Sequence, residues 1–165
     1  MKFNHTEEHV DDNMLLLQAN IDDMNPELCS YVADQLFAIG ANDVYWIPIV
    51  MKKGRPGLML NVLLSNELSS DIEEIIFKET TTLGLRTLAA SCHRLGRRWT
   101  QVNTQWGEVS IKLGFYKGKQ VQYAPEFSQC EAIAHSYNVP LKTVYDQARA
   151  AYQAEINSDD GDDDR

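Results

Sequence analysis

Apolar residues recur along the chain at two spacings, and these spacings predict its secondary structure. Short apolar runs between polar or glycine residues predict buried strands, and apolar residues three or four positions apart predict helices. The clearest helix is expected to have Asn25 as its cap and Pro26 in its first position, and to end at Gly40. The first part of the chain therefore predicts, in order, strand 14–21, helix 26–39, strands 43–50 and 58–64, a helix from Ser70 or Asp71 to Gly84, and strand 85–95.

This order of elements is that of a ferredoxin-like βαββαβ unit, an α+β fold in which both helices cover one face of an antiparallel sheet. In strands 43–50 and 58–64, apolar residues occupy both alternating positions, as Tyr45 and Trp46 illustrate. The sheet face without helices is therefore also apolar, and such a face usually packs against something else. We expect the rest of the chain or a second copy to cover it, and a homo-oligomer is the resulting prediction.

The rest of the chain predicts an appendage on this unit. Its pattern indicates a tight turn at Lys117–Gly118–Lys119, strands at 99–105, 108–116 and 120–124, and helices at 127–137 and 140–155. The expected organisation is a ferredoxin-like unit at 14–97 with a β-hairpin and helical appendage at 98–155 in the same domain. Residues 1–13 and the aspartate-rich stretch 156–165 are expected to be disordered, because they offer little apolar surface to bury.

Length and charge narrow the class of protein. A chain of 165 residues with 44% hydrophobic residues suits one well-packed domain. The net charge of −9 falls mostly on the two ends, so the body lacks the basic stripe that nucleic-acid binding needs. No apolar run is long enough to span a membrane, no secretory leader is apparent, and three scattered cysteines suit reduced thiols. These features predict a soluble cytoplasmic protein that binds neither nucleic acid nor membrane.

A basic loop lies between the second and third predicted strands. Lys52, Lys53 and Arg55 stand within four residues, and Gly54 and Gly57 allow the backbone to turn tightly around them. Lysine supplies a mobile charge, the arginine fork can hold two phosphate oxygens, and backbone N–H groups can turn toward the same ligand. The loop therefore predicts a triphosphate site, and the alternative is a solvated hairpin whose lysines keep the protein soluble.

Asp22 and Asp23 form the best carboxylate pair in the sequence, between the first predicted strand and the first predicted helix. Adjacent carboxylates at a strand end suit Mg²⁺ or Mn²⁺ held together with phosphate oxygens. Carboxylates repel phosphate unless a metal lies between them, so a triphosphate near this pair would require a divalent ion. The alternative is that the two acids only complement the dipole of the following helix.

Two further polar clusters are candidates for the same ligand. Thr80 and Thr81 lie where the second predicted helix ends, and Arg86 follows them as a cation that could face a phosphate. The alternative for the threonines is that their hydroxyls satisfy the last helix carbonyls. A separate cationic group, for which the alternative is a solvated turn, consists of Arg94, Arg97 and Arg98.

Three stretches of the sequence together resemble a known family. They are Asn20–Glu27 (NIDDMNPE), Met51–Gly57 (MKKGRPG) and Glu79–Arg86 (ETTTLGLR), followed by Trp106–Gly107 and Pro125–Glu126. In this order they resemble the carboxy-terminal half of the LarC-type nickel insertion proteins, over about Leu15 to Tyr152. Members of that family insert nickel into a pyridinium bis-thiocarboxylate mononucleotide to make the nickel-pincer cofactor of lactate racemase, and they consume CTP.

The resemblance implies that this chain is the CTP- and divalent-metal-binding part of a nickel chelatase, which is a lyase. Mg or Mn would bridge CTP to Asp22 or Asp23, and the implied nucleotide-binding residues are Lys52, Lys53, Gly54, Arg55, Thr80, Thr81 and Arg86. Nickel and the mononucleotide are the implied substrates, and the amino-terminal half of the family is the implied partner. Neither the catalytic residues nor the nickel ligands are assigned. The competing interpretation is a non-catalytic oligomerisation or regulatory ligand-binding module.

Overall fold

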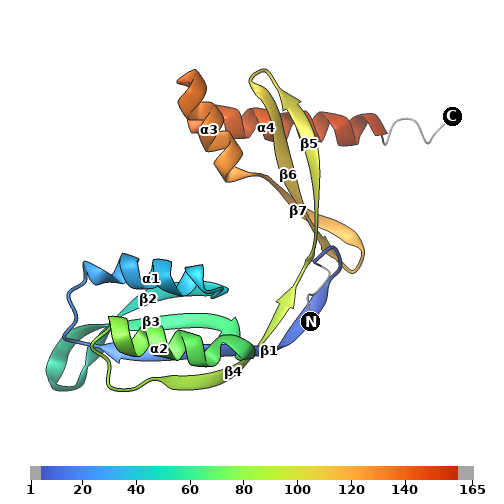
Figure 1. Cartoon of the computed structure of the whole chain (residues 1–165). Coiled ribbons are helices and arrows are strands. Elements are labelled where there is room, and N and C mark those ends of the chain that lie inside the picture. The colour runs from blue at the N-terminus through green and yellow to red at the C-terminus, as the bar shows by residue number, and fades with distance from the viewer. Residues whose placement is uncertain (1–4, 160–165) are drawn as a thin grey trace. The chain divides into compact units, whose positions relative to one another are not determined.

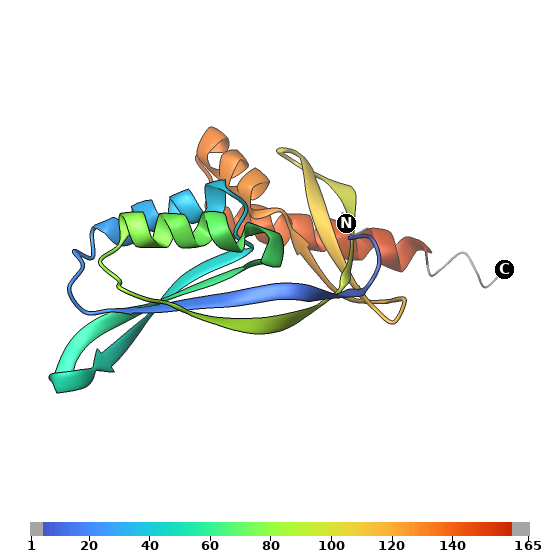
Figure 2. The same cartoon turned by 60° about the horizontal axis from the view of Figure 1, so that its bottom comes forward.

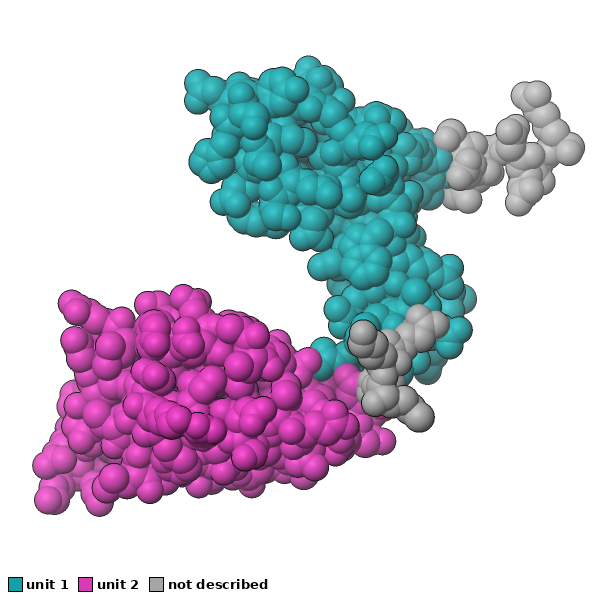
Figure 3. All heavy atoms as spheres, viewed as in Figure 1, with its two compact units in different colours: residues 1–9, 93–165 teal, residues 10–92 magenta. Residues whose placement is uncertain are grey.

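The computed structural model describes residues 5–159, and the chain folds into two compact units. Figure 3 shows that residues 10–92 form one of them, here called the N-terminal unit. The described residues 93–159 together with residues 5–9 form the other, here called the C-terminal unit. No helix among the described residues is long and apolar enough to cross a membrane.

The N-terminal unit has the βαββαβ order that the sequence predicts. Its elements are β1 (His9–Ile21), α1 (Leu28–Ala38), β2 (Asp43–Met51), β3 (Arg55–Ser65), α2 (Ser69–Glu79) and β4 (Arg86–Arg94), with short 3₁₀ turns η1 (Lys52–Gly54) and η2 (Asn66–Leu68) on either side of β3. The sheet has the order β2-β3-β1-β4, and β3 runs antiparallel to both of its neighbours. Figure 1 and Figure 2 show α1 and α2 side by side on one face of this sheet. The predicted ferredoxin-like α+β arrangement is confirmed.

The core of the N-terminal unit lies between the sheet and its two helices. Val62 of β3 pairs with Leu17 of β1 on one side and with Val44 of β2 on the other. Directly opposed residues of an antiparallel sheet point to the same face, so all three side chains meet the helices. Leu17 and Val62 are fully buried there together with Leu36 of α1 and Ile76 of α2. Burying each such side chain contributes about 1.5–3 kcal/mol, which fixes the strand ends and the loops attached to them.

The opposite face of the sheet mixes polar and apolar side chains. Gln18, Asn61 and Tyr45 are neighbours across three strands, and the Gln18 amide donates a 2.8 Å hydrogen bond to Asn61 Oδ1. Tyr45 and Ile47 on β2 are 40% and 38% exposed. The exposed apolar side chains of β2 are the part of this face that a second copy could cover. The homo-oligomer stays a prediction.

The C-terminal unit is a three-stranded antiparallel sheet packed against two helices. Its elements are β5 (Gly96–Thr104), β6 (Gly107–Tyr116), β7 (Lys119–Pro125), α3 (Phe127–Tyr137) and α4 (Leu141–Asp159), with the strands in sequence order. Val102, Ile111 and Val144 are fully buried at the centre of a separate core. Lys117 (φ 50°) and Gly118 (φ 75°) adopt the two consecutive positive φ values that a two-residue hairpin turn needs. The predicted strands and helices are present, with a core of their own.

The N-terminal end of the fold differs from the sequence prediction. β1 begins at His9, within the stretch predicted to be disordered. The backbone N–H of Arg97 donates a 2.8 Å hydrogen bond to the His5 carbonyl, and the Ser91 hydroxyl donates a 3.0 Å bond to Asp12. A polar segment is expected to be disordered when its residues have no hydrogen-bond partners in the protein. Here Ser91 and Arg97, far along the chain, provide such partners, so this part of the disorder prediction is wrong.

Two other boundaries also differ. α4 continues past Glu155 to Asp159, because Ile156 packs against the core of the C-terminal unit. The rest of the two segments predicted to be disordered, 1–4 and 160–165, lies outside the described residues. α1 begins only at Leu28, and the predicted cap Asn25 instead accepts a 3.1 Å hydrogen bond from the Glu27 N–H in the preceding turn.

The exposed β2 surface gives a test of assembly. We expect light scattering at micromolar concentration to give a mass that is a multiple of the 18.7 kDa chain. Ile47→Glu should reduce that mass to the monomer, because it places a charge among the exposed apolar side chains of β2. The matched variant Gln153→Glu adds the same charge at an exposed position of α4 and should leave the mass unchanged. A wild-type chain that is monomeric at this concentration would contradict the prediction.

Candidate functional site

Three loops of the N-terminal unit meet at one end of its sheet. β1 ends at Ile21, which pairs with Leu58 near the start of β3, and β1 lies between β3 and β4. Figure 1 and Figure 2 both show the β1–α1 loop, the β2–β3 hairpin and the α2–β4 loop at this end. The stretches 20–27, 51–57 and 79–86, which are far apart in the sequence, therefore converge in the fold.

The first contact between these loops is an ion pair. Arg55 Nη1, at the start of β3, lies 3.3 Å from Asp22 Oδ2, just after β1. The Asp22 side chain is 16% exposed and that of Arg55 is 55% exposed. A pair this accessible to water contributes at most about 1 kcal/mol to stability, so it can open without unfolding the loops. The predicted carboxylate and the predicted phosphate-binding cation thus lie in direct contact.

The second contact links the α2–β4 loop to the same site. The Thr81 hydroxyl donates a hydrogen bond to Asp23 Oδ1. The Thr80 hydroxyl instead donates a 2.6 Å bond to the Ile76 carbonyl in the last turn of α2, so it serves the helix end. Of the two candidate threonines, the structure brings Thr81 to the carboxylate pair and gives Thr80 the structural role that the sequence left open.

The basic loop forms the tip of the β2–β3 hairpin. Lys52, Lys53 and Gly54 make up the turn η1, in which Lys53 has φ 65° and Gly54 has φ 69°. Both lysine side chains are exposed and make no hydrogen bond or ion pair within the described residues. A Cβ on Gly54 would meet nothing within 4 Å, so its positive φ, and not lack of space, favours glycine here. The turn therefore presents two unpaired ammonium groups at the end of the sheet where Arg55 begins β3.

Gly57 explains why Arg55 reaches Asp22. A Cβ at this position would lie 2.7 Å from the Ile21 carbonyl oxygen and 2.9 Å from Met51 Sδ. Only glycine allows β3 to pass this close to the end of β1 without displacing backbone. The second glycine of the basic stretch thus has a packing role, and it sets the distance between the cationic hairpin and the carboxylates.

Two hollows that the sequence did not reveal flank the site. One has a volume of about 460 Å³ and is lined by Asp22 and by mainly apolar side chains, including Met24, Pro26 and Pro48. The other has a volume of about 510 Å³ and is lined by Lys52, Asn20 and apolar neighbours. Asn20 Oδ1 is buried and has no hydrogen-bond partner among the described residues, a state that costs about 1–3 kcal/mol unless a ligand supplies a donor. In the sequence, Asn20 is a polar residue between the core residues Ala19 and Ile21. Because alternate side chains of a strand point to opposite faces, this pattern could have indicated that Asn20 lies on the sheet face away from the helices.

The remaining predicted cations lie elsewhere. Arg86 is exposed at the first position of β4, at the same end of the sheet as the carboxylates. Arg94 and Arg97 line a different pocket, which belongs to the C-terminal unit. The guanidinium of Arg98 lies over the ring of Phe115, 4.6 Å from its centroid. The three arginines therefore do not form one cationic group, because Arg94 and Arg97 line a pocket and Arg98 contacts an aromatic ring.

The donor set at the carboxylate pair suits a hard divalent cation. Asp22 and Asp23 offer the oxygen ligands that Mg²⁺ and Mn²⁺ prefer. Among residues 5–159, no three His, Cys, Asp or Glu side chains lie close enough together to hold a metal ion by themselves. Burial raises the pKa of the Cys29 thiol and, with the charge of Glu126, that of Cys130. Both thiols therefore stay protonated near neutral pH, where they are weak metal ligands.

The chain matches known proteins along most of its length. A family model described as nickel insertion protein matches residues 2–145. The pyridinium-3,5-bisthiocarboxylic acid mononucleotide nickel insertion protein of Clostridium kluyveri is 42% identical over 142 residues, which cover 86% of this chain and 35% of the relative. The protein of the same description in Clostridium acetobutylicum is 41% identical over 145 residues, 88% of this chain and 34% of the relative. The chain thus spans about a third of the length of the curated relatives it matches.

A solved structure shows which part of such proteins the chain resembles. The structure is that of LarC2 in its apo form, described as the C-terminal domain of a cyclometallase involved in the synthesis of the NPN cofactor of lactate racemase. It is 33% identical in sequence and superimposes with a TM-score of 0.82, and the match covers 88% of this chain and 99% of that one.

Proposed function

Because this chain belongs to the family of nickel insertion proteins and corresponds to their C-terminal domain, we propose that it is the CTP- and divalent-metal-binding part of a nickel insertase. In the proposed reaction, nickel enters the pyridinium-3,5-bisthiocarboxylic acid mononucleotide that the relatives are named for, which makes the chain part of a chelatase, a lyase. The product is the nickel-pincer cofactor of lactate racemase. The observation that supports this role best is the convergence of Asp22, Asp23, Arg55 and Thr81 from three separate loops.

The hairpin cations would hold the triphosphate of CTP. Lys52 and Lys53 offer two unpaired ammonium groups, and the Arg55 guanidinium can hold two oxygens of one phosphate at once. Gly54 can turn its backbone N–H toward the same anion, because no Cβ shields it. Arg86, exposed at the start of β4, would add a fourth cation. The positive charge of these four cations approaches the negative charge of a triphosphate. A single phosphate would neutralise only part of that positive charge.

The two carboxylates would share a Mg²⁺ or Mn²⁺ ion with the phosphate oxygens. Bound there, the ion would neutralise phosphate charge and make the terminal phosphates better leaving groups. The hydrogen bond from Thr81 orients the Asp23 carboxylate, as groups beyond the direct ligands commonly do at metal sites. Asp22 neutralises Arg55 in the absence of ligand and would be released when Arg55 turns to a phosphate.

Asn20 is the proposed contact to the base. Asn20 lines the hollow that Lys52 also lines, so a nucleotide whose phosphates lie at the hairpin could place its base there. A small rotation of the Asn20 side chain would turn its buried Oδ1 toward that base. An amide can donate and accept at the same time, which matches the exocyclic amino group and ring nitrogen of cytosine. Ile49 and Met59 would provide apolar surface for the ring. UTP offers the reversed pattern, a carbonyl at C4 and an N–H at N3, so it would pair with Asn20 only if the amide turned over.

The complete reaction is proposed to need more than this chain. The chain spans about a third of the curated relatives, so the amino-terminal half of the family would supply further groups for nickel and for the mononucleotide. We place the reaction in the cytoplasm, since Cys29, Cys92 and Cys130 are all free thiols. Nickel is a substrate in this scheme, distinct from the Mg²⁺ or Mn²⁺ held with CTP.

Calorimetric titration of the chain with CTP, UTP, ATP and GTP, with and without Mn²⁺, tests the proposed function. We expect CTP to bind more tightly than the other three nucleotides, and Mn²⁺ to strengthen that binding. CMP should bind much more weakly, because it lacks the phosphates that the hairpin cations would hold. Equal affinities for all four triphosphates would reject the role of Asn20. The absence of any nucleotide signal would favour a non-catalytic oligomerisation or regulatory module, for which the exposed β2 surface is the supporting observation.

A further inference from the structure

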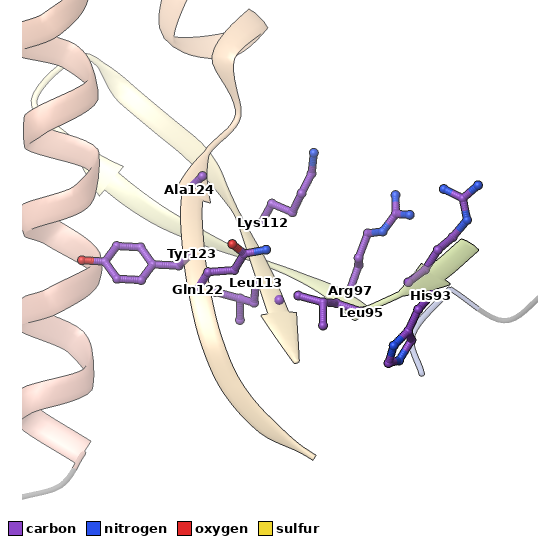
Figure 4. Close-up of a pocket in the computed structure, with 10 residues that line it drawn as sticks. His93, Leu95, Arg97, Lys112, Leu113, Gln122, Tyr123 and Ala124 are labelled. Atoms are coloured by element: carbon purple, nitrogen blue, oxygen red, sulfur yellow. The ribbon is translucent and has the colours of Figure 1, made fainter. Parts of the chain in front are cut away.

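The C-terminal unit contains a cationic hollow that the proposed CTP site does not use. Figure 4 shows this pocket, which has a volume of about 460 Å³, the size of a typical small-ligand site. Its lining includes the cations Arg94, Arg97 and Lys112, the amide of Gln122, and apolar side chains such as Leu113. No carboxylate lies among the described residues that line it, although the chain as a whole carries a net charge of −9. The overall composition of this acidic chain therefore does not explain why positive charge is concentrated in this pocket.

The strand register places these groups together. Arg97 of β5 lies opposite Gly114 of β6, which lies opposite Gln122 of β7, and Lys112 stands two residues before Gly114 on the same face. Figure 4 shows the side chains of Arg97 and Lys112 extending toward the same side of the sheet. A Cβ on Gly114 would lie 2.7 Å from Gln122 Cγ, so a larger residue at this position would require the Gln122 side chain to shift. Most of the hollow is thus lined by β5, β6 and β7, and residues 93–95 complete it.

The charges of this pocket are only weakly compensated. The Lys112 ammonium lies 3.9 Å from Glu126 Oε2, the outer limit of an ion pair, and its side chain is 47% exposed. The Arg97 side chain has no hydrogen bond or ion pair within the described residues. His93, at the rim, already has a partner in Glu8 at 2.7 Å. Arg97 and Lys112 are therefore the two cations with free capacity for an anion.

An exposed aromatic ring lies beside them. Trp99 pairs directly with Lys112 in the strand register, so the two side chains share a face of the sheet, and Trp99 is 53% exposed. The face of an indole attracts a flat cationic ring, whereas a neutral ring gains only stacking. The same surface therefore offers two cations for anionic groups and one electron-rich face for a positively charged ring.

We propose that this pocket binds a pyridinium mononucleotide, with its phosphate on Arg97 and Lys112 and its ring against Trp99. The choice of a pyridinium nucleotide among organic phosphates rests on the function proposed above. The pocket itself rests on the register, the volume and the uncompensated charge. Carboxylate-like groups on the ring can accept hydrogen bonds from the Gln122 amide. The residues named here all belong to the C-terminal unit, whereas those of the proposed CTP site belong to the N-terminal unit.

Nicotinic acid mononucleotide is a suitable probe, since it has one phosphate, a pyridinium ring and a carboxylate on that ring. Calorimetry on the full chain should show binding, and Arg97→Ala and Lys112→Ala should each weaken it about tenfold or more, the scale of one lost charge-assisted hydrogen bond. Trp99→Leu should weaken nicotinic acid mononucleotide more than the neutral-ring uridine monophosphate. The matched variant Lys142→Ala, which removes an exposed lysine of α4, should change nothing.

The same titrations separate this proposal from the CTP proposal. Arg97→Ala and Lys112→Ala should leave CTP binding unchanged, and Arg55→Ala should leave mononucleotide binding unchanged. If nicotinic acid mononucleotide binds as described while CTP does not bind at all, the CTP role fails and the pocket stands. The pocket assignment is overturned if the mononucleotide does not bind, if inorganic phosphate binds equally well, or if Arg97→Ala and Lys112→Ala bind it like the wild type.

Discussion

Replacing Lys52, Lys53 and Arg55 together with alanine is expected to weaken CTP binding by at least about 100-fold. Each substitution removes a charge-assisted hydrogen bond to the triphosphate, which is worth about 1–3 kcal/mol. A single substitution should therefore weaken CTP binding by about 1–3 kcal/mol, less than the triple substitution does. The free energy of unfolding should barely change, because the lysines make no hydrogen bond or ion pair within the described residues and Arg55 is 55% exposed in its pair with Asp22. Calorimetry with CTP and thermal unfolding of the same samples measure the two quantities.

The control for this experiment removes cations from the C-terminal unit. Lys119 and Lys142 are exposed, and their double replacement with alanine should leave CTP affinity unchanged. CMP binding should also respond less than CTP binding to the triple substitution, because CMP carries one phosphate. A triple variant that binds CTP as well as the parent chain would identify the basic stretch as an ordinary solvated hairpin.

The second large effect concerns the metal. With Mn²⁺ present, Asp22→Asn and Asp23→Asn should each weaken CTP binding about 10- to 100-fold, because the amide is a poorer ligand for a hard cation than the carboxylate. Without a divalent ion, the same variants should bind CTP as well as the wild type or better, since a carboxylate that repels phosphate has been removed. Titrations in Mn²⁺ and in chelator measure both arms on each variant.

Two matched variants sharpen this test. Asp34→Asn removes an exposed carboxylate from α1 and should have no effect in either condition. Thr81→Val keeps both carboxylates but removes the hydrogen bond to Asp23, so it should lower affinity only in Mn²⁺ and by less than Asp23→Asn. If Asp22→Asn and Asp23→Asn bind CTP in Mn²⁺ as the wild type does, the two acids are not metal ligands and serve only the contacts to Arg55 and Thr81.

The order of elements could be predicted because local patterns determine it. The apolar spacing of Leu17, Leu36 and Ile76 reflects burial against one sheet, and a βαββαβ order leaves few ways to arrange that sheet. Once the order is known, the strand ends that carry Asp22 and Arg55 must lie at the same end. The sequence could therefore predict which loops meet, although not which atoms touch.

What the sequence could not show depends on contacts between distant residues. The acidic segment before Met14 looks like a solvated tail until Ser91 bonds to Asp12. Thr80 and Thr81 are chemically equivalent in the sequence, and only the path of the chain after α2 gives one to the helix and the other to Asp23. The solvated turn considered as an alternative for the arginines around Gly96 is not what forms, because Arg97 lies in a strand that pairs with β6.

The contact between Arg55 and Asp22 has a consequence for the order in which ligands would bind. In the empty protein the two charges neutralise each other, so a lone metal ion would have to displace Arg55 and a lone triphosphate would have to displace Asp22. A metal–nucleotide complex breaks that contact once and satisfies both groups. Binding of the two would therefore be cooperative, and each would raise the affinity for the other by the same factor. Such a site would ignore free divalent ions and stray phosphate in the cell and respond to their complex.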